Sequence, residues 1–185
     1  MIIVEGPDGA GKTTLIRQLQ ERYELEVAPR VVSKDTEAMT DLQVWVEDNV
    51  QRGFQDLIFD RHRLISEPIY GPILRNKQSP GFTDFPWVSH MLWRFYKSNP
   101  VIIYCLPPLE TVKANIANDP DNVVVADKIE AIYAAYAARA SIDWGAAHST
   151  NLVVWDYTRD FMLEEDPIQY FDSIMKHHNI QKRKP

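Results

Sequence analysis

A loop near the N-terminus carries the residue types that hold the phosphates of a nucleoside triphosphate. The residues of this loop that we expect to bind ATP are Gly6, Asp8, Gly9, Ala10, Gly11, Lys12, Thr13 and Thr14. They satisfy the pattern G-x-x-x-x-G-K-[ST], in which glycines let backbone N–H groups surround phosphate oxygens. Lys12 would reach the β- and γ-phosphates, and the Thr13 hydroxyl would bind Mg²⁺. The pattern therefore predicts a site for ATP and Mg²⁺, with Lys12 as a catalytic residue.

An aspartate followed by two arginines offers a second set of groups that could act on phosphates. Asp60 comes directly after a run of three apolar residues, and arginines occupy positions 61 and 63. A carboxylate at such a strand end commonly helps to hold Mg²⁺ beside a phosphate-binding loop. Arginine can hold phosphate oxygens through two parallel N–H groups. We expect Asp60 to bind the metal, Asp60 and Arg61 to be catalytic, and Arg61 and Arg63 to bind the acceptor. A surface salt bridge is the alternative role for Arg61.

Both sets of residues stand at the ends of strands that the apolar pattern predicts. The expected strands are Met1–Glu5, Glu26–Val32, Asp56–Phe59, Val101–Leu106 and Asn151–Trp155. The expected helices are Lys12–Tyr23, Met39–Arg52, Ile65–Arg75, Phe85–Ser98, Leu109–Ile116, Asp127–Ile142 and Pro167–His177. This alternation predicts an α/β fold with a five-stranded parallel sheet and helices on both faces. The carboxyl ends of parallel strands share one edge, which would bring the phosphate-binding loop close to Asp60.

Length and composition indicate one globular domain over residues 1–185, and they exclude several classes of protein. No apolar run approaches the ~20 residues of a membrane span, and Glu5 ends the apolar start too early for a signal peptide. The single cysteine, Cys105, lies in an apolar run, which predicts a core residue in a cytoplasmic protein. The net charge of −6 argues against general binding of nucleic acid.

The chain resembles the thymidylate kinase branch of the P-loop nucleoside and nucleotide kinases at two motifs. These are the phosphate-binding loop with Asp8 inside it and the sequence Phe59-Asp60-Arg61; residues 101–108 also resemble the strand before the family's lid. The resemblance implies a three-layer P-loop kinase fold, ATP as donor, Mg²⁺ and often a homodimer. It also implies that Asp8 approaches the sugar of the acceptor, while Asp60 and Arg61 lie beside the transferred phosphoryl group.

The expected lid, a short segment near residues 117–127, departs from this family because it contains no arginine. Members commonly place arginines in the lid or in the phosphate-binding loop to neutralise the transferred phosphoryl group. Lys128 or Arg139 is the substitute that this sequence offers. Lys34 stands where the family has a basic motif, and it would either bind an acceptor phosphate or be an ordinary loop lysine. From its place in the layout, the loop 156–159 is expected to contact adenine.

An aromatic stretch, residues 82–96, offers a further place for the acceptor. If it is helical, Arg94 shares a face with Trp87, His90 and Met91, and Arg94 would bind the acceptor while an aromatic ring stacks on a base. The alternative for these residues is core packing or a dimer interface.

Together the motifs predict an ATP- and Mg²⁺-dependent phosphotransferase with a nucleotide-type acceptor, most simply a deoxynucleoside monophosphate such as dTMP. The alternative is a hydroxyl acceptor, either a deoxynucleoside or a hydroxymethylpyrimidine base in phage-type modified DNA; nucleic acid is a partner in the latter case alone. A hydroxyl acceptor must lose a proton, and His62 and Glu67 are candidate bases. A third hypothesis is a nucleotide-binding switch without kinase activity, although the sequence lacks the guanine-reading motif Asn-Lys-x-Asp.

Overall fold

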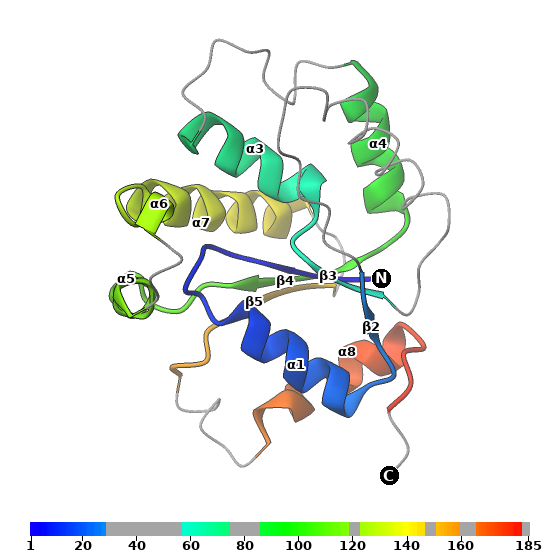
Figure 1. Ribbon diagram of the computed structural model, residues 1–185. Coiled ribbons are helices and arrows are strands. Elements are labelled where there is room, and N and C mark those ends of the chain that lie inside the picture. Colours follow the sequence, from blue (N-terminus) through cyan, green and yellow to red (C-terminus); the bar gives the residue numbers. More distant parts are fainter. Residues whose placement is uncertain (29–56, 75–85, 119–122, 147–150, 160–165, 183–185) are drawn as a thin grey trace.

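A parallel sheet forms the centre of the fold (Figure 1). The computed structural model describes residues 1–28, 57–74, 86–118, 123–146, 151–159 and 166–182. The strands are β1 (Ile2–Glu5), β2 (Glu26–Val27), β3 (Leu57–Asp60), β4 (Val101–Cys105) and β5 (Leu152–Trp155). They form one sheet in the order β2-β3-β1-β4-β5, and each pair of neighbours is parallel. The predicted five-stranded parallel sheet is therefore confirmed.

Helices cover both faces of this sheet. They are α1 (Lys12–Arg22), α3 (Arg63–Leu74), α4 (Pro86–Lys97), α5 (Leu109–Ala117), α6 (Val123–Ala126), α7 (Ile129–Ala146), the 3₁₀ helix η4 (Pro167–Phe171) and α8 (Asp172–His177). Figure 1 shows α1 and α8 on one face of the sheet and α3 and α7 on the other. The three predicted layers are thus present. Within the described ranges, no helix combines the length and the apolar character that crossing a membrane requires.

The boundaries of some elements differ from the prediction. The predicted helix 127–142 is preceded by the separate turn α6, and α7 continues to Ala146. The side chain of Asp143 holds this extra turn in place, since it is buried and accepts a hydrogen bond of 2.5 Å from the Tyr104 hydroxyl on β4. Of the predicted strand 26–32 the structure describes Glu26–Val27 as strand, and the predicted helix 39–52 lies outside the described residues.

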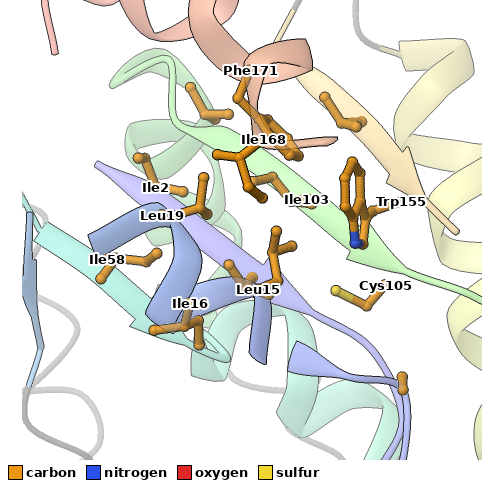
Figure 2. Close-up of a cluster of buried hydrophobic side chains, with 14 of the residues drawn as sticks. Ile2, Leu15, Ile16, Leu19, Ile58, Ile103, Cys105, Trp155, Ile168 and Phe171 are labelled. Atoms are coloured by element: carbon orange, nitrogen blue, oxygen red, sulfur yellow. The ribbon is translucent and has the colours of Figure 1, made fainter. Parts of the chain in front are cut away.

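Two apolar clusters hold the layers together, one on each face of the sheet. Alternation along β1 sends Ile2 and Val4 into the cluster beneath α1 and sends Ile3 into the cluster beneath α3 and α7. Figure 2 shows the first cluster, in which Leu15 and Leu19 of α1 meet side chains from the strands and from η4. Cys105 is one of its buried members, which agrees with the prediction of a core residue.

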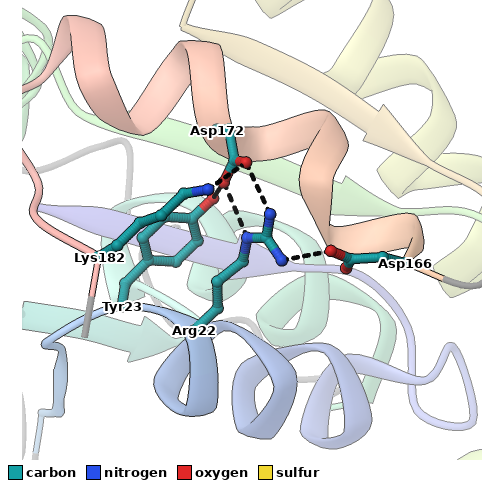
Figure 3. A network of polar contacts seen from close by, with 5 residues as sticks. All are labelled: Arg22, Tyr23, Asp166, Asp172 and Lys182. Carbon is teal, nitrogen blue, oxygen red and sulfur yellow. Dashed lines mark hydrogen bonds and ion pairs between the residues drawn. The ribbon is translucent and has the colours of Figure 1, made fainter. Parts of the chain in front are cut away.

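A polar cluster at the surface ties the end of α1 to the C-terminal segment (Figure 3). We call it the Arg22 cluster; its members are Arg22, Tyr23, Asp166, Asp172 and Lys182. Arg22 donates to Asp172 Oδ1 at 2.8 Å and to Asp172 Oδ2 at 2.6 Å. Arg22 also donates to Asp166 Oδ2 at 2.5 Å. The cluster fastens the last described residues against α1, and Tyr23 and Lys182 form an antiparallel backbone bridge beside it.

Candidate active site

The phosphate-binding loop connects β1 to α1 at the carboxyl edge of the sheet. Gly6 has a φ of +143°, and a Cβ there would lie 2.5 Å from the carbonyl oxygen of Cys105, so that only glycine fits. Lys12 begins α1, and its Nζ donates a hydrogen bond of 2.6 Å to the carbonyl oxygen of Pro7. Burial and the nearby Arg61 guanidinium lower the pKa of Lys12 to about 8. An anionic partner would favour the charged ammonium again, as the predicted role of Lys12 requires.

Arg61, Asp8 and Tyr70 form a hydrogen-bonded group beside this loop, which we call the Arg61 cluster. Arg61 Nη2 donates to Asp8 Oδ1 at 2.6 Å and to the Tyr70 hydroxyl at 2.7 Å. The Tyr70 hydroxyl in turn donates to Asp8 Oδ2 at 2.8 Å, and the guanidinium carbon lies 4.7 Å from the centre of the Tyr70 ring. Burial opposes the ionisation of Asp8, but Arg61 and Lys12 outweigh it and lower the pKa of Asp8. The phosphate-binding loop therefore carries an ionised, oriented carboxylate.

The backbone of Arg61 is strained in a way that directs its side chain. Its φ is +67°, a left-handed conformation that costs a non-glycine residue on the order of 1 kcal/mol. The N–H of Arg61 donates to the carbonyl oxygen of Val4 at 2.9 Å, which continues the pairing of β3 with β1. The turn sends the guanidinium back toward the loop, where Nε lies 3.4 Å from the carbonyl oxygen of Gly6. The structure thus gives Arg61 a partner in the loop itself, rather than the surface helix acid that the sequence allowed.

Beneath these groups lies a buried carboxylate, Glu5, at the end of β1. Its side chain has no solvent exposure. Oε1 accepts a hydrogen bond of 2.6 Å from the backbone N–H of His62, and Oε2 accepts one of 3.0 Å from the Tyr136 hydroxyl on α7. Burial raises the pKa of Glu5 to about 7, although the His62 N–H, Arg61, Tyr136 and Lys12 all favour its ionised form.

Thr13 and Asp60 are the residues predicted to hold Mg²⁺. Thr13 lies exposed in the first turn of α1, and Asp60 ends β3 opposite Val4 of β1. Asp60 Oδ1 is buried and accepts no hydrogen bond from any residue that the structure describes. A buried carboxylate oxygen without a partner fits a hard cation, which prefers oxygen ligands.

On the other side of the loop, neutral groups contact the glycines. The Nδ2 of Asn115, on α5, donates to the carbonyl oxygen of Gly9 at 2.8 Å and to the Tyr157 hydroxyl at 2.9 Å. The Tyr157 ring faces Gly11, since a Cβ on Gly11 would lie 2.9 Å from its Cε1. Tyr157 belongs to the loop 156–159, which is predicted to contact adenine. The structure places its ring against the phosphate-binding loop.

The remaining predicted residues have different surroundings. Arg63 is half-buried at the start of α3, while Lys34 lies outside the described residues. Arg94 is half-buried on α4, and within the described part of the chain neither a hydrogen bond nor an ion pair joins it to the phosphate-binding loop. Arg139, offered as a substitute for a lid arginine, is instead held by the Asp143 carboxylate at 3.0 Å.

His62 is a poor candidate for a general base. Its ring is fully buried, 5.4 Å from the ring of Phe59 and 4.7 Å from that of Phe95 between centres. Burial lowers its pKa to about 3, so the ring stays neutral and belongs to the core. Met91 of the predicted acceptor face is also a core residue.

Sequence reasoning missed three residues of this region: Glu5, Tyr136 and Asn115. A signal existed for Glu5, because an acid that ends an apolar strand buried on both faces must have partners. Tyr136 and Asn115 lie on helices far along the chain, and no local pattern points from either of them to the loop.

The fold of this chain is similar to that of several solved structures. A deoxyadenosine kinase from M. mycoides with bound dCTP is similar, with a TM-score of 0.56 and 14% identity over 95% of this chain and 100% of that chain. The YorR protein from Bacillus subtilis, in complex with phosphorylated GDP, is similar with a TM-score of 0.61 and 16% identity over 96% of this chain and 97% of that chain. The deoxyadenosine kinase with its products dCMP and dCDP has a TM-score of 0.58 and 17% identity over 96% and 98% of the two chains.

The fold is that of the P-loop kinases. No model of a known protein family matches the sequence, and no curated protein sequence matches it either. Identities of this size show the fold alone, so the thymidylate kinase branch stays a prediction. The predicted three-layer P-loop kinase fold is confirmed.

Proposed function

We propose that this protein, which has the P-loop kinase fold, transfers the γ-phosphoryl group of ATP to the hydroxyl group of a deoxynucleoside. The observation that carries the proposal is the ionised Asp8 carboxylate, held in the phosphate-binding loop by Arg61 and Tyr70. A fixed carboxylate can accept a hydrogen bond from a hydroxyl group of the acceptor sugar. The similarity to deoxyadenosine kinase structures supports the same class of acceptor.

In this proposal the residues of the chain position and neutralise the reacting groups. Lys12 exchanges its bond to the Pro7 carbonyl for one to the donor phosphates, and Arg61 lies beside the transferred phosphoryl group. Thr13 and Asp60 would hold Mg²⁺, which supplies further neutralisation of the phosphate oxygens. Phosphoryl transfer gains most of its rate from such alignment and charge stabilisation. The acceptor hydroxyl must also lose its proton, and because His62 is buried and neutral, Glu67 on α3 is the predicted base that would take it.

A second candidate acceptor is a deoxynucleoside monophosphate such as dTMP, which the motif Phe59-Asp60-Arg61 favours. In that case Arg61, Arg63, Arg94 and Lys34 would be needed to bind the acceptor phosphate. A hydroxymethylpyrimidine base in DNA is a third acceptor, against which the net charge of −6 argues.

The homodimer that the resemblance implies also stays a prediction. Its support is the exposure of large apolar side chains on two helices, because Trp93 of α4 is 58% exposed and Ile142 of α7 is 66% exposed. Sedimentation of the purified protein tests it.

The test of the proposed function is a measurement of ATP-to-ADP conversion with Mg²⁺ and a panel of acceptors. The panel contains deoxynucleosides, deoxynucleoside monophosphates and DNA that carries hydroxymethylpyrimidine, and Lys12→Ala serves as the blank. We expect turnover with a deoxynucleoside and near silence without an acceptor. Turnover with a monophosphate alone would support the second candidate, and ATP hydrolysis that ignores every acceptor would indicate a switch.

A further inference from the structure

The buried carboxylate of Glu5 has no part in the proposed reaction, and yet it lies directly beneath the residues that do. Alternation along β1 points Glu5 to the same face as Ile3, toward the apolar cluster beneath α3 and α7. Burying a carboxylate there costs free energy unless its oxygens are well partnered. A hydrophobic residue would be the ordinary occupant of this position, so the partners of Glu5 indicate what the carboxylate does.

Those partners connect Glu5 to the turn that contains Arg61. Oε1 accepts the N–H of His62, the residue directly after Arg61 and directly before α3. On the other side of Arg61, its own N–H is held by the carbonyl oxygen of Val4. The peptide units on both sides of this strained residue are therefore fastened to the last two residues of β1.

We infer that Glu5 is a positioning residue: its carboxylate holds the backbone after Arg61, so that the guanidinium stays directed at Asp8 in the phosphate-binding loop. The inference rests on the proposed function, because Arg61 is the group through which Glu5 acts on phosphoryl transfer. Tyr136 completes the arrangement, since its hydroxyl donates to Oε2 from α7 and fixes the orientation of the carboxylate. Without the acceptor at Oε1, the His62 N–H would be buried without its 2.6 Å partner, and the left-handed turn at Arg61 could relax.

Two substitutions separate this role from simple packing. Glu5→Gln keeps an oxygen that accepts the His62 N–H, and its NH₂ can donate to the Tyr136 hydroxyl. Glu5→Met fills a similar volume but removes both acceptors, while it also removes the cost of burying a charge. We expect Glu5→Gln to keep kcat within about threefold of wild type, and Glu5→Met to lower kcat by about 10²-fold, the loss that a misplacement near 1 Å can cause.

A double-mutant cycle tests whether the effect runs through Arg61. In an Arg61→Ala background we expect Glu5→Met to change kcat by less than threefold, because the group that Glu5 positions is gone. Asp143→Asn is the matched control, because Asp143 is also a buried carboxylate with tyrosine partners. Unlike Glu5, it links α7 to β4, and among the described residues it does not contact the turn at Arg61. This substitution should leave kcat unchanged whatever it does to stability.

Several outcomes would overturn the inference. They are wild-type activity in Glu5→Met, an equal loss in both backgrounds of the cycle, or a 10²-fold loss in a folded Glu5→Gln. Should Glu5→Met fail to fold, Glu5→Gln alone decides, because retained activity supports the role of the acceptor oxygen and lost activity refutes it.

A spectroscopic measurement keeps the inference separate from the proposed function. The side-chain Nε–H signal of Arg61 in ¹⁵N NMR, assigned by its loss in Arg61→Lys, should exchange slowly with solvent in wild type and Glu5→Gln. In Glu5→Met it should exchange at least tenfold faster. If no acceptor is phosphorylated by wild type, the proposed function fails, and equal exchange in all three proteins would overturn the positioning role independently.

Discussion

Two clusters of this molecule each contain an arginine and a tyrosine that both donate hydrogen bonds to one aspartate. In one, Arg61 and Tyr70 both donate to Asp8. In the other, Arg22 and Tyr23 both donate to Asp172. The bond lengths are similar in the two clusters, with a shortest arginine–carboxylate distance of 2.6 Å in the first and 2.6 Å between Arg22 and Asp172 in the second.

The difference lies in what surrounds each carboxylate. Asp172 also accepts from Lys182 and ties the C-terminal segment to the end of α1 (Figure 3). Asp8 belongs to a phosphate-binding loop at the carboxyl edge of the sheet, where ligands of such folds bind, and Asp60 Oδ1 has no partner among the described residues. The same kinds of group therefore join two elements at the surface in the Arg22 cluster, whereas in the Arg61 cluster they meet at the edge where the ligands of the proposed reaction would bind.

The largest expected effect is on catalysis and separates the two arginines. Arg61→Ala should lower kcat by about 10³-fold, because in the proposed reaction it removes the positive charge beside the transferred phosphoryl group. Arg22→Ala should leave kcat within twofold of wild type. Steady-state kinetics of both variants with the best acceptor provide the measurement, and equal losses of activity would show that Arg61 has no special role in catalysis.

The second effect is on stability against pH. The pKa of Glu5 is raised from 4.5 to about 7, so the folded state binds more protons than the unfolded state between these values. The free energy of unfolding therefore falls as pH rises through this window, by up to about 3 kcal/mol. Glu5→Gln lacks this loss, and its stability relative to wild type should increase from pH 4.5 to pH 7.

Comparing Glu5→Gln with wild type cancels the contribution of His62, which has the opposite sign because burial lowers its pKa. In the Arg22 cluster, the hydrogen bonds from Arg22 lower the pKa of Asp172, so its contribution is present at neutral pH and is lost in acid. Urea titrations at several pH values measure both effects. A constant difference between Glu5→Gln and wild type would contradict the expected titration of Glu5.

The third expected effect is on stability, and it comes from Arg22, the arginine whose removal should leave kcat nearly unchanged. Arg22→Ala should lower the free energy of unfolding by about 2 kcal/mol, because it leaves Asp172 and Asp166 without their main partner. Chemical denaturation measures the change, and Lys176→Ala on the exposed side of α8 is the control that should stay near wild type. A stability equal to wild type would show that the cluster does not fasten the C-terminal segment.

The smallest effect distinguishes the two tyrosines. Tyr23→Phe should cost about 1 kcal/mol of stability, the contribution of one hydrogen bond, with no change in KM. Tyr70→Phe should raise the acceptor KM several-fold, because Asp8 loses the hydroxyl that orients it. Melting temperature and KM are measured for both variants, and an unchanged KM in Tyr70→Phe would show that Tyr70 does not contribute to acceptor binding.

Much of the fold could be predicted because it depends on local patterns. Apolar runs mark the strands, and the glycine-rich motif stands between the first strand and the first helix, where the structure has the loop. Because parallel strands share one carboxyl edge, the sequence also predicts that Asp60 and Arg61 lie close to that loop. The extra turn of α7 was missed, since it depends on Asp143 meeting Tyr104 of a strand 39 residues away in sequence.

The glycine-rich loop between β1 and α1, the parallel sheet and the charged residues available at its edge could all be predicted from the sequence, because they follow from composition and short-range spacing. The tertiary structure decided which charges meet. Arg61 reaches Asp8 across 53 residues, and Tyr136 reaches Glu5 across 131. The direction of the Arg61 side chain depends on packing and on the left-handed turn at this residue. The neighbouring residues in the sequence predict neither.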